Sequence, residues 1–129
     1  MAVNKDMPIL VVDDFNTMRR IVRSLLKQLG FNNVDEAVDG DDALSKITAK
    51  DYALILSDWN MEPKSGIELL RDVRQNEKYK NMPFILITAE SKVENIVEAK
   101  KAGVNQYIVK PFNAKTLKEK LSSVIGDFN

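Results

Sequence analysis

The chain has 129 residues, of which 44% are hydrophobic and 29% are charged, and it carries 19 basic and 19 acidic side chains. This length and composition predict one globular domain over residues 1–129, and the balanced charge gives no general attraction for nucleic acid or an anionic membrane. The chain has no cysteine and no histidine, which excludes disulfides, cysteine-bound zinc and a phosphohistidine carrier role. Any bound metal must therefore have oxygen ligands.

No segment of the sequence has the pattern of a targeting signal or a membrane span. The N-terminal apolar run is too short for a signal peptide, and no stretch approaches the ~20 apolar residues that cross a membrane. We therefore expect a monomeric cytoplasmic protein with no membrane insertion and no nucleic-acid partner.

Five short apolar runs alternate with amphipathic segments along the chain. The runs are Ile9–Val12, Val34–Ala37, Ala53–Leu56, Phe84–Ile87 and Tyr107–Val109. Apart from the weaker second run, they are apolar throughout, which is typical of strands buried on both faces of a parallel sheet.

The segments between the runs have the periodicity of amphipathic helices. The predicted helices are Met18–Leu29 before Gly30, about Asp41–Ala49, one opening with a capping box at Ser65 and Glu68, one opening with Ser91 and Glu94 and ending at Gly103, and one opening at Asn113. Five strand–helix repeats predict an α/β fold, with a five-stranded parallel sheet covered by helices on both faces.

Polar side chains follow four of the five predicted strands. Asp13 and Asp14 come after the first strand and Asp58 after the third, while Thr88 follows the fourth and Lys110 the fifth. Ligands of open α/β sheets bind beyond the carboxyl ends of the strands, so we expect these side chains to lie around one crevice.

Each of these residues alone has an ordinary structural explanation. Asp13 and Asp14 could cap a helix, and Lys110 could be a solvated loop charge. Three carboxylates at one sheet edge, however, would repel one another by several kcal/mol if they were dry and unpaired. A divalent cation held by Asp13, Asp14 and Asp58 would remove this repulsion, so the sequence predicts a metal site.

A metal, a hydroxyl and an ammonium together suit a phosphoryl group, whose oxygens carry spread negative charge. Aspartate can attack phosphorus and form an acyl phosphate, and Asp58 is the candidate because Asp13 and Asp14 flank it. Lys110 would pair with one phosphoryl oxygen, and the Thr88 hydroxyl would donate a hydrogen bond to another.

The residues above stand in four stretches: "VVDDFNTMRRIVRSLLKQLGFNNVDEAVDGDDAL", "SDWNM", "ITAE" and "YIVKPF". In these the chain resembles the receiver domain of two-component signalling, and more narrowly the stand-alone chemotaxis response regulators of the CheY type. The resemblance covers essentially the whole chain. It implies a flavodoxin-like (βα)5 fold with strand order 2-1-3-4-5. It also implies a phosphoacceptor, with only weak self-catalysed phosphorylation and dephosphorylation, rather than an enzyme.

The resemblance assigns roles at the site. Asp58 would be the phosphoacceptor, and Mg²⁺ would be bound directly by Asp14 and Asp58, by the backbone carbonyl of Asn60, and by Asp13 through water. Thr88 and Lys110 would hold the phosphoryl group. The Lys110-Pro111 peptide bond is expected to be cis.

The resemblance also implies a switch and its partners. Tyr107 would turn inward when Thr88 moves toward the phosphate, which would change the face formed by the fourth helix, fifth strand and fifth helix. That face, around Val93, Ile96, Tyr107 and Lys120, would bind the flagellar motor switch protein. The phosphodonor would be a phosphohistidine of the chemotaxis kinase, and a phosphatase is a further expected partner.

The sequence departs from this family in two places. After Asn60 the family usually reads Met-Pro-x-Met-Asp-Gly, whereas this chain reads "MEPKSG", which displaces the proline and replaces the aspartate with Ser65. We expect Ser65 still to cap the third helix and Glu62 to add a carboxylate near the metal. On the partner face, Val93 and Ser123 stand where chemotaxis regulators commonly have lysine.

Three other functions are alternatives for a chain with these residues. A phosphatase of the haloacid dehalogenase type needs Asp-x-Asp after its first strand, but here Phe15 follows Asp13-Asp14 and Asn60 takes the acid–base position after Asp58. In a flavin-binding module, the acidic pair would repel the cofactor phosphate. Within the family, a regulator that serves as a phosphate sink or phosphorelay intermediate, without binding a motor, remains the alternative.

Overall fold

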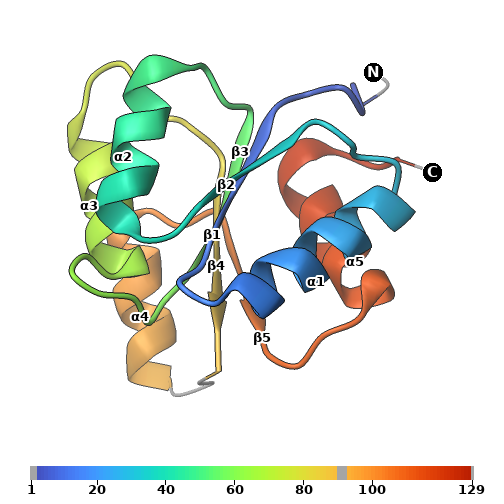
Figure 1. The fold of residues 1–129 in the computed structure, drawn as a ribbon. Helices are drawn as coiled ribbons and strands as arrows, with labels where there is room; N and C mark the ends of the chain where they lie inside the picture. The colour runs from blue at the N-terminus through green and yellow to red at the C-terminus, as the bar shows by residue number, and fades with distance from the viewer. Residues whose placement is uncertain (1–2, 90–92, 129) are drawn as a thin grey trace.

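The computed structural model describes residues 3–89 and 93–128, which form a parallel sheet between two layers of helices (Figure 1). Its strands are β1 (Ile9–Val12), β2 (Val34–Ala37), β3 (Leu54–Asp58), β4 (Phe84–Thr88) and β5 (Gln106–Val109). Its helices are α1 (Asn16–Gln28), α2 (Gly40–Ala49), α3 (Gly66–Gln75), α4 (Val93–Ala102) and α5 (Ala114–Ile125). The strands lie in the order β2-β1-β3-β4-β5, all parallel, which confirms the order that the resemblance implied.

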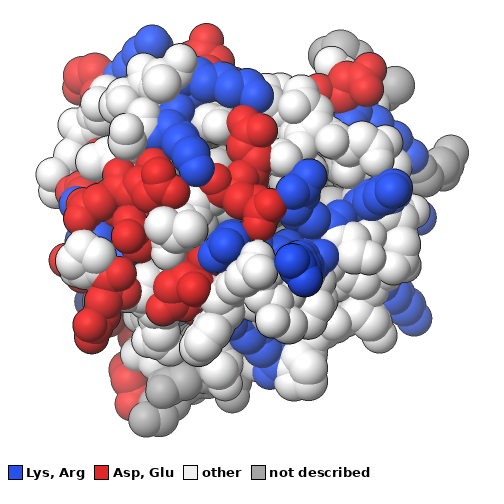
Figure 2. Space-filling view, in the orientation of Figure 1, with Lys and Arg blue, Asp and Glu red and all other residues white. Residues whose placement is uncertain are grey.

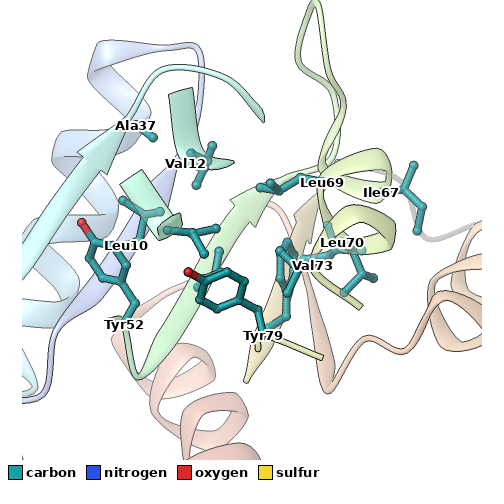
Figure 3. Packing of buried hydrophobic residues seen from close by; sticks show 14 of the residues in the cluster. Leu10, Val12, Ala37, Tyr52, Ile67, Leu69, Leu70, Val73 and Tyr79 are labelled. Carbon is teal, nitrogen blue, oxygen red and sulfur yellow. The ribbon is translucent and has the colours of Figure 1, made fainter. Parts of the chain in front are cut away.

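Each face of the sheet has its own apolar core. Helices α2, α3 and α4 cover one face, and α1 and α5 cover the other (Figure 1). Because side chains alternate along a strand, Leu10 packs beneath the first group and Val11 beneath the second. Figure 3 shows the first core, where Leu69 and Val73 of α3 pack toward the sheet. Burial on both faces explains why the central strands read as continuous apolar runs.

The predicted elements are all present among the described residues, but two strands extend further at their carboxyl ends than their apolar runs. The Trp59 N–H donates to the Ile87 carbonyl at 2.9 Å, so the ladder continues through Ser57 and Asp58, both of which are buried. Similarly, β4 continues to Thr88. Asp58 and Thr88 are therefore the last residues of their strands rather than the first residues of loops, which fixes their backbones within the sheet.

The helix ends follow the expected local chemistry. Ser65 and Glu68 form the predicted capping box of α3, and Asn113 caps α5 by accepting from the Thr116 N–H. Ser91, predicted to open α4, lies outside the described residues. The Lys110-Pro111 bond is cis, as expected.

Charge is unevenly distributed over the surface. In Figure 2, Lys and Arg side chains gather over α1, whereas Asp and Glu gather on the side of α2 and α3. Over the part of the chain that the structure describes, no helix combines the length and apolarity needed to cross a membrane.

Candidate phosphoacceptor and metal site

Three carboxylates meet at the carboxyl ends of the two central strands. Asp13 and Asp14 follow β1, and Asp58 ends β3, the neighbour of β1 in the sheet. One oxygen from each of the three lies within 4.8 Å of the others. Asp13 and Asp58 are buried while Asp14 is exposed, so the cluster is closed on the protein side and open to solvent through Asp14.

Asp13 is held in place by its neighbours along the chain. Its Oδ1 accepts a hydrogen bond from the Phe15 N–H at 2.9 Å. Burial raises the pKa of Asp13 above its usual value, the Phe15 N–H acts in the opposite direction, and the charge of Asp58 raises it further. Asp13 and Asp14 do not cap α1, because the N-cap residue of α1 is Phe15 and no side chain accepts a capping hydrogen bond there.

Asp58 is paired with Lys110 across the end of the sheet. The Lys110 Nζ lies 2.9 Å from Asp58 Oδ1 and 3.7 Å from Asp13 Oδ2. Burial raises the pKa of Asp58, and the Lys110 ammonium lowers it in part. The Lys110 ammonium therefore already reduces the repulsion among the three carboxylates. The sequence did not predict this pairing of Lys110 with Asp58. Two carboxylate charges remain uncompensated.

Asp13→Asn is expected to stabilise the metal-free protein at neutral pH, because it removes a buried charge while the amide oxygen can still accept from Phe15. A carboxyl whose pKa is raised in the folded state makes the protein less stable as pH rises between its ordinary and its raised pKa. The gain in the midpoint of thermal unfolding should thus be a few degrees at pH 7 and vanish below pH ~4. Thermal melts in EDTA across this pH range measure it, and a gain that persisted at low pH would contradict the account.

Thr88 ends the strand next to Asp58, and Asn60 follows Asp58 by two positions along the chain. In the sheet Asp58 is in register with Ile87, so Thr88 is one residue further along the neighbouring strand, where it is buried. Asn60 lines a surface pocket together with Asp14 and Glu62. Glu62 shares this pocket with Asp14, but it is not among the described residues whose ligand atoms cluster within 4.8 Å.

The "MEPKSG" loop caps α3 and contacts the start of α2. Ser65 accepts from the Glu68 N–H, which confirms that the serine can take the capping role. Lys64 forms an ion pair with Asp72 and packs against Gly40 at the start of α2. The Glu62-Pro63 bond is cis, which nothing in the sequence indicated.

Gly66 is a site-supporting residue that the sequence analysis missed. A Cβ placed on it would lie 2.1 Å from the carbonyl oxygen of Asp58. The Gly66 N–H also donates to the Trp59 carbonyl at 2.9 Å. The start of α3 therefore rests directly on the backbone of Asp58, and only the glycine after the capping serine could have signalled this contact.

The residues predicted to form the partner face lie on α4, β5 and α5. The Lys120 Nζ lies 4.8 Å from the centre of the Tyr107 ring, so α5 and β5 meet at these residues. Val93 and Ile96 both lie on α4, where Val93 is 72% exposed and Ile96 is half-buried. Ser123 accepts a hydrogen bond from Gln106 Nε2 at 3.2 Å, which ties α5 to β5 beside Tyr107.

The sequence and the fold both resemble those of known proteins. The chain is 55% identical over 122 residues to the chemotaxis protein CheY-3 of Vibrio cholerae, covering 95% of this chain and 94% of that one. It is 49% identical over 123 residues to the chemotaxis protein CheY of Pseudomonas aeruginosa, covering 95% and 99%. Among solved structures, V. cholerae CheY4 matches with a TM-score of 0.86 at 35% identity, covering 92% of this chain and 98% of that one.

A second solved structure bears on the acidic site. It is the receiver domain of a sensor histidine kinase from P. aeruginosa, with a magnesium ion coordinated in its active site cleft. It matches with a TM-score of 0.85 at 28% identity, covering 95% of this chain and 99% of that one. Residues 9–122 of the chain match the family described as the response regulator receiver domain. The chain belongs to that family, whose members are signalling phosphoacceptors, and within it to the CheY type.

Proposed function

We propose that this chain is a phosphorylation switch of bacterial chemotaxis that takes a phosphoryl group onto Asp58 and then binds the flagellar motor switch. The observation that carries the proposal is the buried carboxylate of Asp58, set 2.9 Å from the Lys110 ammonium within the acidic cluster. A nucleophilic carboxylate beside a fixed cation is what transfer of a charged phosphoryl group requires.

In this proposal, an Asp58 oxygen attacks the phosphorus of a phosphohistidine on the chemotaxis kinase. The phosphorus–nitrogen bond breaks, the imidazole leaves with the electron pair, and an acyl phosphate forms on Asp58. Lys110 moves from the carboxylate to a phosphoryl oxygen, and Thr88, at the end of the neighbouring strand, donates its hydroxyl to another.

The residues of the acidic cluster fit Mg²⁺. They supply only oxygen ligands, their ligand atoms are close enough to share one ion, and two carboxylate charges remain after pairing with Lys110. We assign direct ligation to Asp14, Asp58 and the backbone carbonyl of Asn60, and water-mediated contact to Asp13. Bound Mg²⁺ would neutralise charge on the phosphoryl oxygens.

Lys110→Arg separates charge from shape at this position. The variant keeps a cation beside Asp58 but replaces a compact ammonium with a wide planar fork. It should still accept phosphate from acetyl phosphate, yet switch poorly, so phosphate-dependent binding to a partner should fall while phosphorylation is retained. If the phosphorylated variant bound the partner as tightly as wild type does, Lys110 would act only as a surface charge.

The output is tested by titrating the protein with an N-terminal peptide of the motor switch protein from the same organism, with a stable phosphate mimic present. Such peptides are acidic and amphipathic, so lysines around Tyr107 and Lys120 should speed association. Val93 and Ser123 lack two of these charges, each worth about 0.2–1 kcal/mol. Wild type should bind measurably, and Val93→Lys/Ser123→Lys should bind more tightly, with the gain lost at high salt.

The titration also decides between the motor regulator and the phosphate sink or relay. Absence of wild-type binding with the mimic, together with efficient phosphotransfer from the chemotaxis kinase, would favour the sink. The 72% exposure of Val93 favours a partner other than an acidic peptide, because it adds apolar area to the same face.

A further inference from the structure

The two peptide units that flank the Asp13 Cα are each held by one hydrogen bond. The Asp13 N–H donates to the Ala37 carbonyl of β2 at 3.1 Å. The Asp13 carbonyl, which belongs to the same peptide unit as the Asp14 N–H, accepts from Arg19 Nη1 at 2.8 Å. The orientation of this peptide sets the directions in which the Asp13 and Asp14 side chains leave the backbone.

Arg19 is itself held rigidly. Its side chain is only 13% exposed, and its Nε donates to Glu36 Oε1 at 2.9 Å. Glu36 lies on β2 in register with Val11, so the guanidinium bridges a β2 carboxylate and the carbonyl at the end of β1. Its Nη2 also donates to Asn16 Oδ1 at 3.4 Å. A planar guanidinium with three partners keeps its direction better than a flexible ammonium would.

Arg23 provides a contrast on the same helix. Its Nη1 donates to the second oxygen of Glu36 at 2.6 Å, and its side chain is 47% exposed. Burial works against ionisation of Glu36, but the two arginines together lower its pKa. Both arginines therefore neutralise Glu36, and Arg19 also donates a hydrogen bond to the Asp13 carbonyl.

We infer that Arg19 is a positioning residue for the acidic pair: by holding the Asp13 carbonyl against β2, it fixes the geometry in which Asp13 and Asp14 meet a divalent cation. This inference rests on the proposed Mg²⁺ site. It assigns to α1 a role in cation binding although α1 contributes no ligand.

Charge and geometry predict opposite effects when an arginine is removed. Loss of a nearby positive charge alone favours binding of a cation, by an amount that is small at an exposed position. Loss of the hold on the Asp13–Asp14 peptide weakens binding, since groups that orient metal ligands typically change affinity by tenfold or more when removed. Arg19→Gln and Arg23→Gln remove the same charge from the same Glu36, so the pair separates the two effects.

The experiment is a titration of the full chain with Mg²⁺, followed by the fluorescence of Trp59, which lines the pocket with Asp14 and Asn60. The dissociation constant should rise about tenfold in Arg19→Gln and stay within about twofold of wild type in Arg23→Gln. Arg19→Lys keeps the charge but replaces the planar fork, whose separate nitrogens bind Glu36 and the Asp13 carbonyl, with a single ammonium, so its affinity for Mg²⁺ should also fall. Thermal unfolding in EDTA monitors the folding of each variant.

Each outcome has a distinct meaning. If wild type shows no Mg²⁺ response, the proposed metal site fails. If wild type responds and Arg19→Gln binds as tightly, or both glutamine variants weaken equally, the positioning role is overturned. Should Arg19→Gln not fold, the same comparison is made between Arg19→Lys and Arg23→Lys, and unchanged affinity in Arg19→Lys overturns the inference.

Discussion

Asp58→Asn is expected to fold normally and to accept no detectable phosphoryl group from acetyl phosphate or from the chemotaxis kinase. The amide is nearly the size of the carboxylate it replaces and its oxygen can still accept from Lys110, so the end of β3 should keep its structure. An amide oxygen, however, lacks the charge that makes a carboxylate nucleophilic toward phosphorus. Asp13 and Asp14 should not substitute, because neither ends a strand beside Thr88.

The measurement is mass spectrometry after borohydride trapping of the acyl phosphate, which locates the modified residue. Asp13→Asn is the matched control, since it makes the same chemical change in the same cluster. It should weaken Mg²⁺ binding and slow phosphorylation while the label stays on Asp58. A label on Asp13 or Asp14 in wild type would contradict the assignment of the phosphoacceptor.

Gly66→Ala is expected to destabilise the fold by about 2 kcal/mol or more, although alanine is the better helix former. Helix propensity alone predicts a gain of up to about 1 kcal/mol, so the sign of the change is informative. The added Cβ would lie 2.1 Å from the Asp58 carbonyl oxygen, a backbone atom that the sheet prevents from moving away. Either α3 or the end of β3 must shift, and a shift of β3 displaces the phosphoacceptor.

The free energy of unfolding, measured by chemical denaturation, should therefore fall in Gly66→Ala. The rate of phosphorylation by acetyl phosphate should fall as well. Ser65→Ala is the control at the next position, because it removes the capping acceptor of α3 at a cost of about 1 kcal/mol but adds no atom near Asp58. Its stability should fall while phosphorylation stays close to wild type. Equal or greater stability in Gly66→Ala would show that the close contact is relieved at no cost.

The sequence predicted the layers of the fold and the place of the site for identifiable reasons. Continuous apolar runs separated by amphipathic segments require a parallel sheet covered on both faces, and the topology of such a sheet brings the residues after its strands together. Asp13, Asp58 and Lys110 could therefore be grouped without coordinates. The order of the strands came only from the resemblance, because periodicity does not say which strands are neighbours.

What the sequence could not predict are particular contacts between distant side chains. Lys110 pairs with Asp58 although 52 positions separate them, and Glu36 anchors Arg19 from another strand. Whether a basic residue reaches an acid depends on strand register and helix orientation, which a one-dimensional pattern does not contain. The ends of β3 and β4 were missed for a related reason, since Ser57 and Thr88 are polar residues whose burial depends on their neighbours.

The pairing of Lys110 with Asp58 has a thermodynamic consequence for the order of events at the site. The three carboxylates and one ammonium together carry a formal charge of −2, which the proposed Mg²⁺ would cancel. Phosphorylation replaces one carboxylate charge with an acyl phosphate of about −2, leaving the group near −3 without the ion and near −1 with it. Modification should therefore strengthen the affinity for the cation, and by reciprocity the cation should stabilise the modified state by the same free energy. Magnesium would then act as a second ligand of the switch, shifting the equilibrium between its unmodified and phosphorylated states.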